Sequence, residues 1–234
     1  MPLPDRPRLR AVLFDMDGTL VDTEGLWWQA AEDVASGLGH RLGAADTPDV
    51  LGRAVEHTAA HLHRVSLGGR PETDIAAALH TRFAALVATD VRPLPGVLTL
   101  LDALAAAAVP IALVSASPRT VVDLVLAVLG RERFAITVAA GETPRTKPAP
   151  DPYRRAADSL GVPPSQCVAV EDTPTGVASA EAAGCAVLAV PSLTSIAPGP
   201  RRTVRQTLHD VDLPLLQSLV PAAPDGIAPL PADA

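Results

Sequence analysis

The fold of this chain is decided by residues 9–22, which read LRAVLFDMDGTLVD. The run 9–14 is apolar except for one arginine and is short enough for a buried strand of a parallel sheet. Asp15 and Asp17 follow two residues apart, so both carboxylates point to the same side. Gly18 permits a sharp turn behind them. Because open parallel sheets bind ligands beyond the carboxyl ends of their strands, the stretch predicts a functional site at this edge.

The two carboxylates also indicate what kind of site this is. Asp15 and Asp17 repel each other unless a cation or a shared proton lies between them. A site built only from carboxylate and water oxygens suits Mg²⁺. One acid can then act as a nucleophile and the other as a general acid and base. A plain turn is the simpler interpretation of Asp17-Gly18 alone, whereas the whole stretch with its strand favours the site.

The pattern Asp-x-Asp-Gly-Thr-x-x-Asp behind an apolar strand resembles the first motif of the haloacid dehalogenase superfamily, notably its phosphatases and phosphomutases with a helical cap. The resemblance implies an α/β fold: a doubly wound parallel sheet with a small all-helical cap domain inserted after the first strand. Residues 1–22 and 93–220 are then expected to form the core and residues 23–92 the cap. The stretch 221–234, rich in Pro and Ala, is expected to be a disordered tail.

A phosphate site is predicted where the apolar run 111–114 ends in Ser115. A serine there, leading into a helix over 119–129, offers a hydroxyl and backbone N–H groups such as that of Ala116. Ser117 is expected to cap this helix. Capping is also the alternative role for Ser115. In the resembled family the serine in its place holds the transferred phosphate.

Lys147 lies in the run Thr-Lys-Pro-Ala-Pro-Asp-Pro, which resembles the third motif of the family. Pro148 restricts the backbone of Lys147 to an extended conformation, which limits how far the ammonium group moves. A positioned ammonium can neutralise both a phosphate and a nucleophilic carboxylate. A solvated surface charge is the simpler interpretation of an isolated lysine. The run has no Gly-Lys-Ser/Thr step and so is not a nucleotide-binding P-loop.

A further pair of acids, Glu171 and Asp172, ends the predicted strand 167–170. Carboxylates at a second strand end can supply the remaining oxygen ligands of a divalent cation. The resemblance assigns Asp172 to the metal together with Asp15 and Asp17, and Glu171 to the metal or its immediate surroundings. A turn that only caps the following helix is the alternative for Asp172.

The acid at position 17 indicates the reaction class. Halide leaves without a proton, whereas the alkoxide expelled from a phosphate ester needs one, and Asp17 can provide it. The resemblance therefore implies a Mg²⁺-dependent phosphatase that acts on small phosphate monoesters through an aspartyl phosphate on Asp15. A sugar phosphate is the first expectation and phosphoglycolate the second. The alternatives are a β-phosphoglucomutase-like sugar phosphomutase and a catalytically silent binding or regulatory protein.

The cap is expected to select the substrate. Helical patterns without strands fall at 26–38, 50–65 and 75–87. Candidate substrate contacts are Glu24, Trp27 and Arg53, and β-phosphoglucomutases carry a histidine where Trp27 stands. His57 and His61 share a helical face, but the glutamate of the zinc-protease motif is missing beside His57, so no histidine metal site is expected.

Composition limits the partners. The formal net charge of −7 argues against nucleic acid, whose partners are basic. The start of the chain lacks the apolar segment of a signal peptide, and no apolar run is long enough to span a membrane. Two cysteines do not make a disulfide framework. The expectation is a cytoplasmic enzyme, a monomer or weak homodimer, that binds a small phosphate ester and contacts neither nucleic acid nor membrane.

Overall fold

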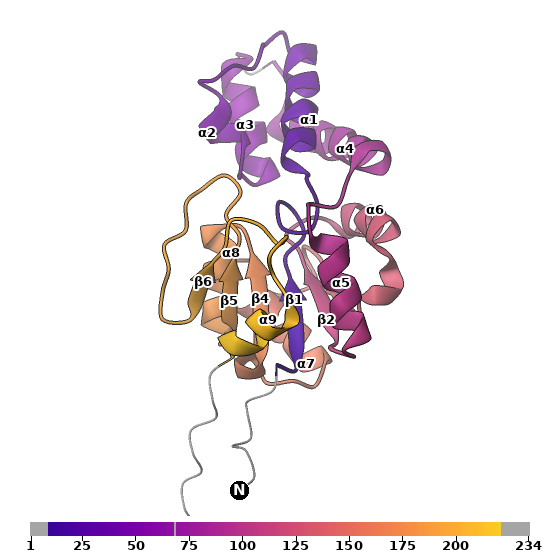
Figure 1. Cartoon of the computed structure of the whole chain (residues 1–234). Coiled ribbons are helices and arrows are strands. Elements are labelled where there is room, and N and C mark those ends of the chain that lie inside the picture. Colours follow the sequence, from indigo (N-terminus) through magenta and orange to yellow (C-terminus); the bar gives the residue numbers. More distant parts are fainter. Residues whose placement is uncertain (1–8, 68, 221–234) are drawn as a thin grey trace, which may run out of the picture.

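The computed structural model describes residues 9–67 and 69–220, and its centre is a six-stranded parallel sheet (Figure 1). The strand order is β3-β2-β1-β4-β5-β6. The strands are β1 (Ala11–Phe14), β2 (Ile111–Val114), β3 (Ile136–Val138), β4 (Cys167–Glu171), β5 (Ala186–Ala189) and β6 (Arg202–Val204). Since the order reverses between β1 and β4, the crevice at their carboxyl ends is the expected ligand position of a doubly wound sheet.

Strand β1 explains why both faces of the sheet carry helices. All four of its residues are buried, and alternate side chains point to opposite faces. Val12 and Phe14 join one apolar cluster, with helices α5, α6 and α9, while Ala11 and Leu13 join a second, with α7 and α8. The helices of the core are α5 (Val97–Ala106), α6 (Arg119–Leu129), α7 (Asp151–Ser159), α8 (Pro174–Ala183) and α9 (Leu213–Leu219).

The expected helical insertion follows β1 as four helices, which we call the helical unit: α1 (Glu24–Gly37), α2 (Thr47–Val50), α3 (Val55–Val65) and α4 (Glu72–Asp90). Figure 1 shows the unit beyond the carboxyl ends of the strands. It has an apolar cluster of its own, which includes Leu62, Ile75 and Leu79. Its two connections to the core lie side by side, because the Asp22 N–H donates to Arg92 O and the Leu94 N–H donates to Leu20 O, each at 3.0 Å.

The helical unit also packs directly on the core. Helix α4 contacts α6, and its buried Phe83, Leu86 and Val87 belong to the same apolar cluster as Val12 and Phe14 of the sheet. The unit is therefore joined to the core by buried apolar surface as well as by two connecting segments.

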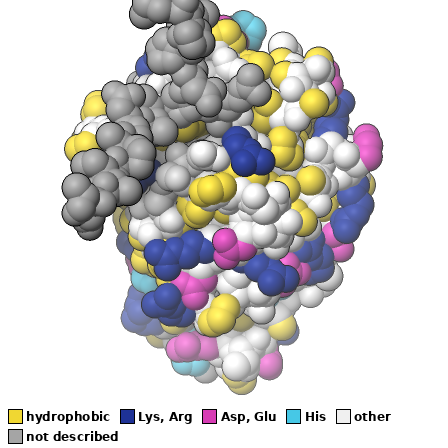
Figure 2. Space-filling view, turned by 90° about the horizontal axis from the view of Figure 1, so that it is seen from below, with side chains coloured by type: hydrophobic (Ala, Val, Ile, Leu, Met, Phe, Trp, Pro, Cys, Tyr) yellow, Lys and Arg dark blue, Asp and Glu magenta, His cyan; other side chains and the backbone are white. Residues whose placement is uncertain are grey.

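The remaining surface carries charges of both signs. Figure 2 looks at the end of the molecule away from the helical unit, where Lys and Arg side chains lie next to Asp and Glu. Within the described residues, none of the helices has the length and apolar character that a membrane crossing requires. The tail expected at 221–234 lies outside the described residues.

Candidate active site

Four loops bring the predicted residues together at the carboxyl edge of the sheet. Asp15 directly follows β1, Ser115 follows β2, and Asp172 follows β4. Lys147 comes from the loop between β3 and α7. Parallel strands present their carboxyl ends at one edge, so four segments far apart in sequence converge there.

Lys147 is the central cation of this edge. Its Nζ lies 2.6 Å from Asp15 Oδ1 and 2.6 Å from Glu171 Oε1, and it donates to Val114 O at 2.9 Å. Its side chain is 7% exposed, so the ammonium is held by these three acceptors rather than by bulk water. The solvated surface charge considered for Lys147 is therefore not what the structure contains.

Burial sets the protonation of the group. It raises the pKa of Asp15 well above its usual range; the Lys147 charge opposes this shift, while Glu171, Asp172 and Asp17 add to it. Burial alone would lower the pKa of Lys147, but Asp15 and Glu171 outweigh it and raise that pKa, so the lysine stays charged. Burial also raises the pKa of Asp172 to about 7, with a hydrogen bond from Ser192 opposing the shift.

The acids could hold a metal ion. Carboxylate oxygens of Asp15, Glu171 and Asp172 lie within 4.8 Å of one another, and in 9–67 and 69–220 this is the one group of acids, histidines or cysteines that does so. Three buried carboxylates around one ammonium leave an excess of negative charge that a divalent cation would balance. Carboxylate oxygens are also the donors that Mg²⁺ prefers, so the donor set fits that ion.

Asp17 is held apart from this group. Its Oδ1 accepts from Thr23 Oγ1 at 2.9 Å, and its Oδ2 accepts from Ser117 Oγ at 2.8 Å and Ser115 Oγ at 3.2 Å. Burial raises the pKa of Asp17, and the three hydroxyl groups limit the rise. The structure thus separates the two predicted acids: Asp15 faces the lysine and Asp17 faces hydroxyl groups.

The expected role of Ser117 as a helix cap is wrong. Pro118 occupies the N-cap position of α6, which no side chain caps, and the Ser117 hydroxyl donates to Asp17 instead. Ser115 accepts the N–H of Ser117 at 2.9 Å, so it fixes the turn that Ala116 occupies. Both serines therefore belong to the site.

Sequence reasoning missed Tyr153, which is fully buried on α7 and donates to Glu171 Oε1 at 2.5 Å. The Lys147 ammonium lies 5.1 Å from the centre of its ring. Glu171 is enclosed on another side by Gly176, where a Cβ would overlap its carboxylate. Glu171 is thus committed to Lys147 and Tyr153. The one sequence signal for Tyr153 was its position directly after the proline-rich motif that contains Lys147.

The three candidate substrate residues of the helical unit lie in different surroundings. Glu24 is half-buried, and its Oε1 lies 3.1 Å from Ser192 Oγ. Trp27 donates its indole N–H to Val50 O at 2.8 Å and packs edge-on against Phe83 inside the unit. Arg53 is exposed, and its Nε donates to Pro48 O at 2.8 Å.

The two histidines that share a helical face, His57 and His61, pair with acids. His61 Nε2 lies 2.7 Å from Asp46 Oδ1, and His57 Nε2 lies 2.8 Å from Asp49 Oδ1. Neither histidine belongs to a metal-binding group within the described residues.

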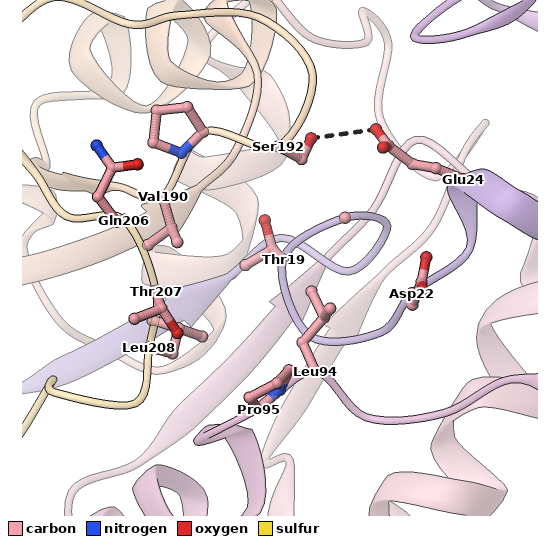
Figure 3. Close-up of a pocket in the computed structure, with 12 residues that line it drawn as sticks. Thr19, Asp22, Glu24, Leu94, Pro95, Val190, Ser192, Gln206, Thr207 and Leu208 are labelled. Carbon is pink, nitrogen blue, oxygen red and sulfur yellow. Dashed lines mark hydrogen bonds between the residues drawn. The ribbon is translucent and has the colours of Figure 1, made fainter.

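A pocket of about 290 Å³ lies beside the loop that follows β1 (Figure 3). Its wall is formed by Gly18 and Thr19 of that loop, by both segments that connect the helical unit, and by the segments that follow β5 and β6. Glu24 and Ser192 meet at its edge, joined by a hydrogen bond in Figure 3. The pocket therefore borders both the site and the helical unit.

Comparisons with known proteins agree with this geometry. A family model described as a haloacid dehalogenase-like hydrolase matches residues 9–184. Protein CbbY of Rhodobacter capsulatus is 35% identical over 195 residues, covering 79% of this chain and 86% of that protein. Hexitol phosphatase A of Escherichia coli K12 is 37% identical over 211 residues, covering 89% and 91%. The crystal structure of CbbY from Rhodobacter sphaeroides in complex with phosphate has a TM-score of 0.78 at 27% identity, covering 89% and 99%.

Proposed function

Because the chain belongs to the haloacid dehalogenase-like hydrolases, we propose that this phosphoric monoester hydrolase cleaves small sugar or polyol phosphates, with Mg²⁺ and an aspartyl phosphate on Asp15. The observation that carries the proposal is the position of Lys147, whose Nζ lies 2.6 Å from both Asp15 and Glu171, two acids that have oxygens within 4.8 Å of an Asp172 oxygen. This arrangement presents a buried carboxylate beside a fixed cation at the ligand-binding edge of the sheet.

Asp15 is the proposed nucleophile. A carboxylate oxygen of Asp15 attacks phosphorus in line, a new O–P bond forms, and the bond to the leaving oxygen breaks. Lys147, which already contacts Asp15, offsets charge on the transferred group, and Ser115 together with the backbone N–H of Ala116 binds its oxygens. Water then hydrolyses the aspartyl phosphate and releases inorganic phosphate.

Asp17 is the proposed general acid and base. Its raised pKa favours a carboxyl group that can give a proton to the leaving alkoxide and later take one from the attacking water. The hydroxyl groups of Thr23, Ser115 and Ser117 aim it. Asp17 and Asp15 can act in turn because they lie in different hydrogen-bond networks.

Mg²⁺ would be held by Asp15 and Asp172, with Glu171 beside them, and would supply charge stabilisation for the phosphoryl oxygens. The metal ligands proposed from the sequence also include Asp17. Both of its carboxylate oxygens accept hydrogen bonds from hydroxyl groups, so its ligand to Mg²⁺ would be the backbone carbonyl oxygen. The excess negative charge of the three buried acids supports the assignment.

The helical unit is the proposed cap, covering residues 23–92, and the rest of the folded chain is the core. A hydroxyl-rich substrate is supported by the relative named hexitol phosphatase, by Glu24 at the start of α1 and by the exposed Arg53 of the unit. The indole of Trp27 has no group that takes up and returns a proton at neutral pH, and its N–H donates to Val50 O. Hydrolysis is therefore proposed in preference to phosphate return to a sugar.

The test is phosphate release from hexose phosphates, hexitol phosphates and phosphoglycolate, each with Mg²⁺ and with excess chelator. Release from a hexose or hexitol phosphate that requires Mg²⁺ is expected. NMR of the products from β-glucose 1-phosphate separates the two reaction types: free glucose with phosphate supports hydrolysis, whereas glucose 6-phosphate appearing ahead of phosphate shows a mutase. Full release in excess chelator would contradict the Mg²⁺ assignment.

A further inference from the structure

One hydroxyl group outside the sequence motifs connects the helical unit to the acid group. Ser192 follows β5, and its Oγ donates to Asp172 Oδ2 at 2.6 Å. The same oxygen lies 3.1 Å from Glu24 Oε1, on the first residue of α1 (Figure 3). A single side chain thus contacts a candidate metal ligand of the core and the start of the helical unit.

Asp172 is held in place from several sides. Thr19 Oγ1 donates to its Oδ1 at 3.3 Å, while Ser192 donates to its Oδ2. Gly18 lies beneath with φ +76°, and a Cβ there would overlap the Asp172 carboxylate and lie 3.3 Å from Ser192 Oγ. Because donors that hold a metal-binding carboxylate set its orientation, Ser192 and Thr19 determine how Asp172 faces a cation.

The serine cannot serve both acids equally. A hydroxyl group has one proton, so it donates to one carboxylate at a time. The shorter contact is with Asp172, and Glu24 competes for the same proton from 3.1 Å. The position of Glu24 therefore affects how firmly Ser192 holds Asp172.

A second contact of the same loop reaches the helical unit. A Cβ built on Gly52, in the segment between α2 and α3, would lie 3.9 Å from Leu193 Cδ1. Leu193 is adjacent to Ser192 and half exposed. The loop after β5 thus meets the unit at α1 and at the α2–α3 segment, so displacement of the unit would change the surroundings of Ser192.

We propose that Ser192 is a positioning residue that orients Asp172 for the divalent cation and, through Glu24, links cation affinity to the position of the helical unit. The inference rests on the proposed Mg²⁺ site and adds to it a residue that connects the site with the cap. It concerns binding of the cation, so it can be measured without any substrate.

The experiment is calorimetric titration of the full chain with Mg²⁺ in the absence of substrate. Ser192→Ala is expected to weaken Mg²⁺ binding ~10-fold, the lower end of the range for lost partners of metal ligands. Ser192→Thr keeps the hydroxyl and should restore most of the affinity. Ser195→Ala, an exposed serine of the same loop, is the matched control and should bind as the unchanged protein does.

The link to the unit is tested by repeating the titration with Glu24→Gln. The amide introduced by this substitution is uncharged and can turn its NH2 group to donate to Ser192 Oγ, which favours Asp172 as the acceptor of the serine proton, so Ser192→Ala should weaken Mg²⁺ binding more in this background. Equal costs in the two backgrounds would overturn the link, and unchanged Mg²⁺ affinity in Ser192→Ala would overturn the positioning role. If the unchanged protein bound no Mg²⁺, the proposed cofactor itself would be wrong and this inference would fall with it.

Discussion

Ser117 Oγ donates to Asp17 Oδ2 at 2.8 Å, a contact between residues one hundred positions apart in the chain. The hydroxyl precedes α6 yet does not cap it. With Ser115 and Thr23 it encloses the Asp17 carboxylate in hydroxyl donors. The proposed general acid and base is therefore aimed from two sides, by the loop after β2 and by the residue that precedes α1.

Removal of this contact should be visible in the pH profile. Ser117→Ala takes away a hydrogen bond to the ionised form of Asp17, so the already raised pKa of Asp17 should rise further. Because Asp17 must be ionised to accept a proton from water, the acidic limb of kcat should move to higher pH. A hydrogen bond to a charged group contributes about 1.5 kcal/mol or more, so kcat on the acidic limb should fall ~10-fold.

The matched control for Ser117 is Thr120→Ala, on the exposed first turn of α6. This substitution should change neither the value of kcat nor the pH at which kcat falls on the acidic side. If Ser117→Ala left the acidic limb of the pH profile of kcat unchanged, the contact of Ser117 with Asp17 would be structural only.

Replacement of Asp15, the proposed nucleophile, should separate binding from turnover. Asp15→Asn should still bind substrate but should retain well under a tenth of the rate, since an amide is a very poor nucleophile. Asp158→Asn removes the same charge from an exposed acid of α7 and should remain active. Retention of a tenth or more of the rate by Asp15→Asn would argue against the covalent step.

Loss of a proposed metal ligand should change the requirement for Mg²⁺. Excess chelator should stop turnover and added Mg²⁺ should restore it. Loss of a residue that only supports a metal ligand weakens metal binding ~10-fold or more. Asp172→Ala removes a proposed ligand itself, so it should raise the Mg²⁺ concentration for half-maximal rate by at least that factor. The measurement is rate against Mg²⁺ concentration. If Asp172→Ala and the unchanged protein reached half-maximal rate at the same Mg²⁺ concentration, Asp172 would not be a metal ligand.

Tyr153 should resist alkaline titration. Burial, followed by the charges of Glu171 and Asp15, raises its pKa well above the usual value near 10. The unfolded chain then loses the phenol proton at lower pH than the folded chain does, so the free energy of unfolding should fall as pH rises above about 10. Tyr153 is the one tyrosine of the sequence, so tyrosinate absorbance reports it alone. Ionisation of the native protein near pH 10 would contradict the buried contact with Glu171.

The part of the molecule that local signals govern was predictable. The expected helix 119–129 has those bounds, since Pro118 can start a helix and Gly130 ends it. The parallel sheet of the core follows from short apolar runs, and the convergence of Asp15, Ser115 and Asp172 follows from their positions at the ends of these runs. Two short elements, α2 and β6, went unpredicted because four and three residues carry too little periodicity.

The side chains that were missed share a physical reason. Ser117 carries a strong local signal for a helix cap, yet its partner Asp17 comes from the loop after β1, far away in the sequence. Tyr153 and Ser192 likewise act on acids that only the fold brings near. Spacing along the chain identifies residues that bear chemistry, but it does not reveal which neutral hydroxyl groups hold them.

The placement of β1 has a consequence for biosynthesis. Val12 pairs with Ile111 on one side and with Val168 on the other, so neither neighbour exists when β1 leaves the ribosome. At ~5–20 residues per second, the first partner is made about 5 to 20 s later. Through that interval the newly made chain carries an unpaired apolar strand, and only the helices of the insertion can fold beside it. We therefore expect the nascent chain to be most dependent on chaperones before β2 is translated, and β4 to complete the sheet centre later still.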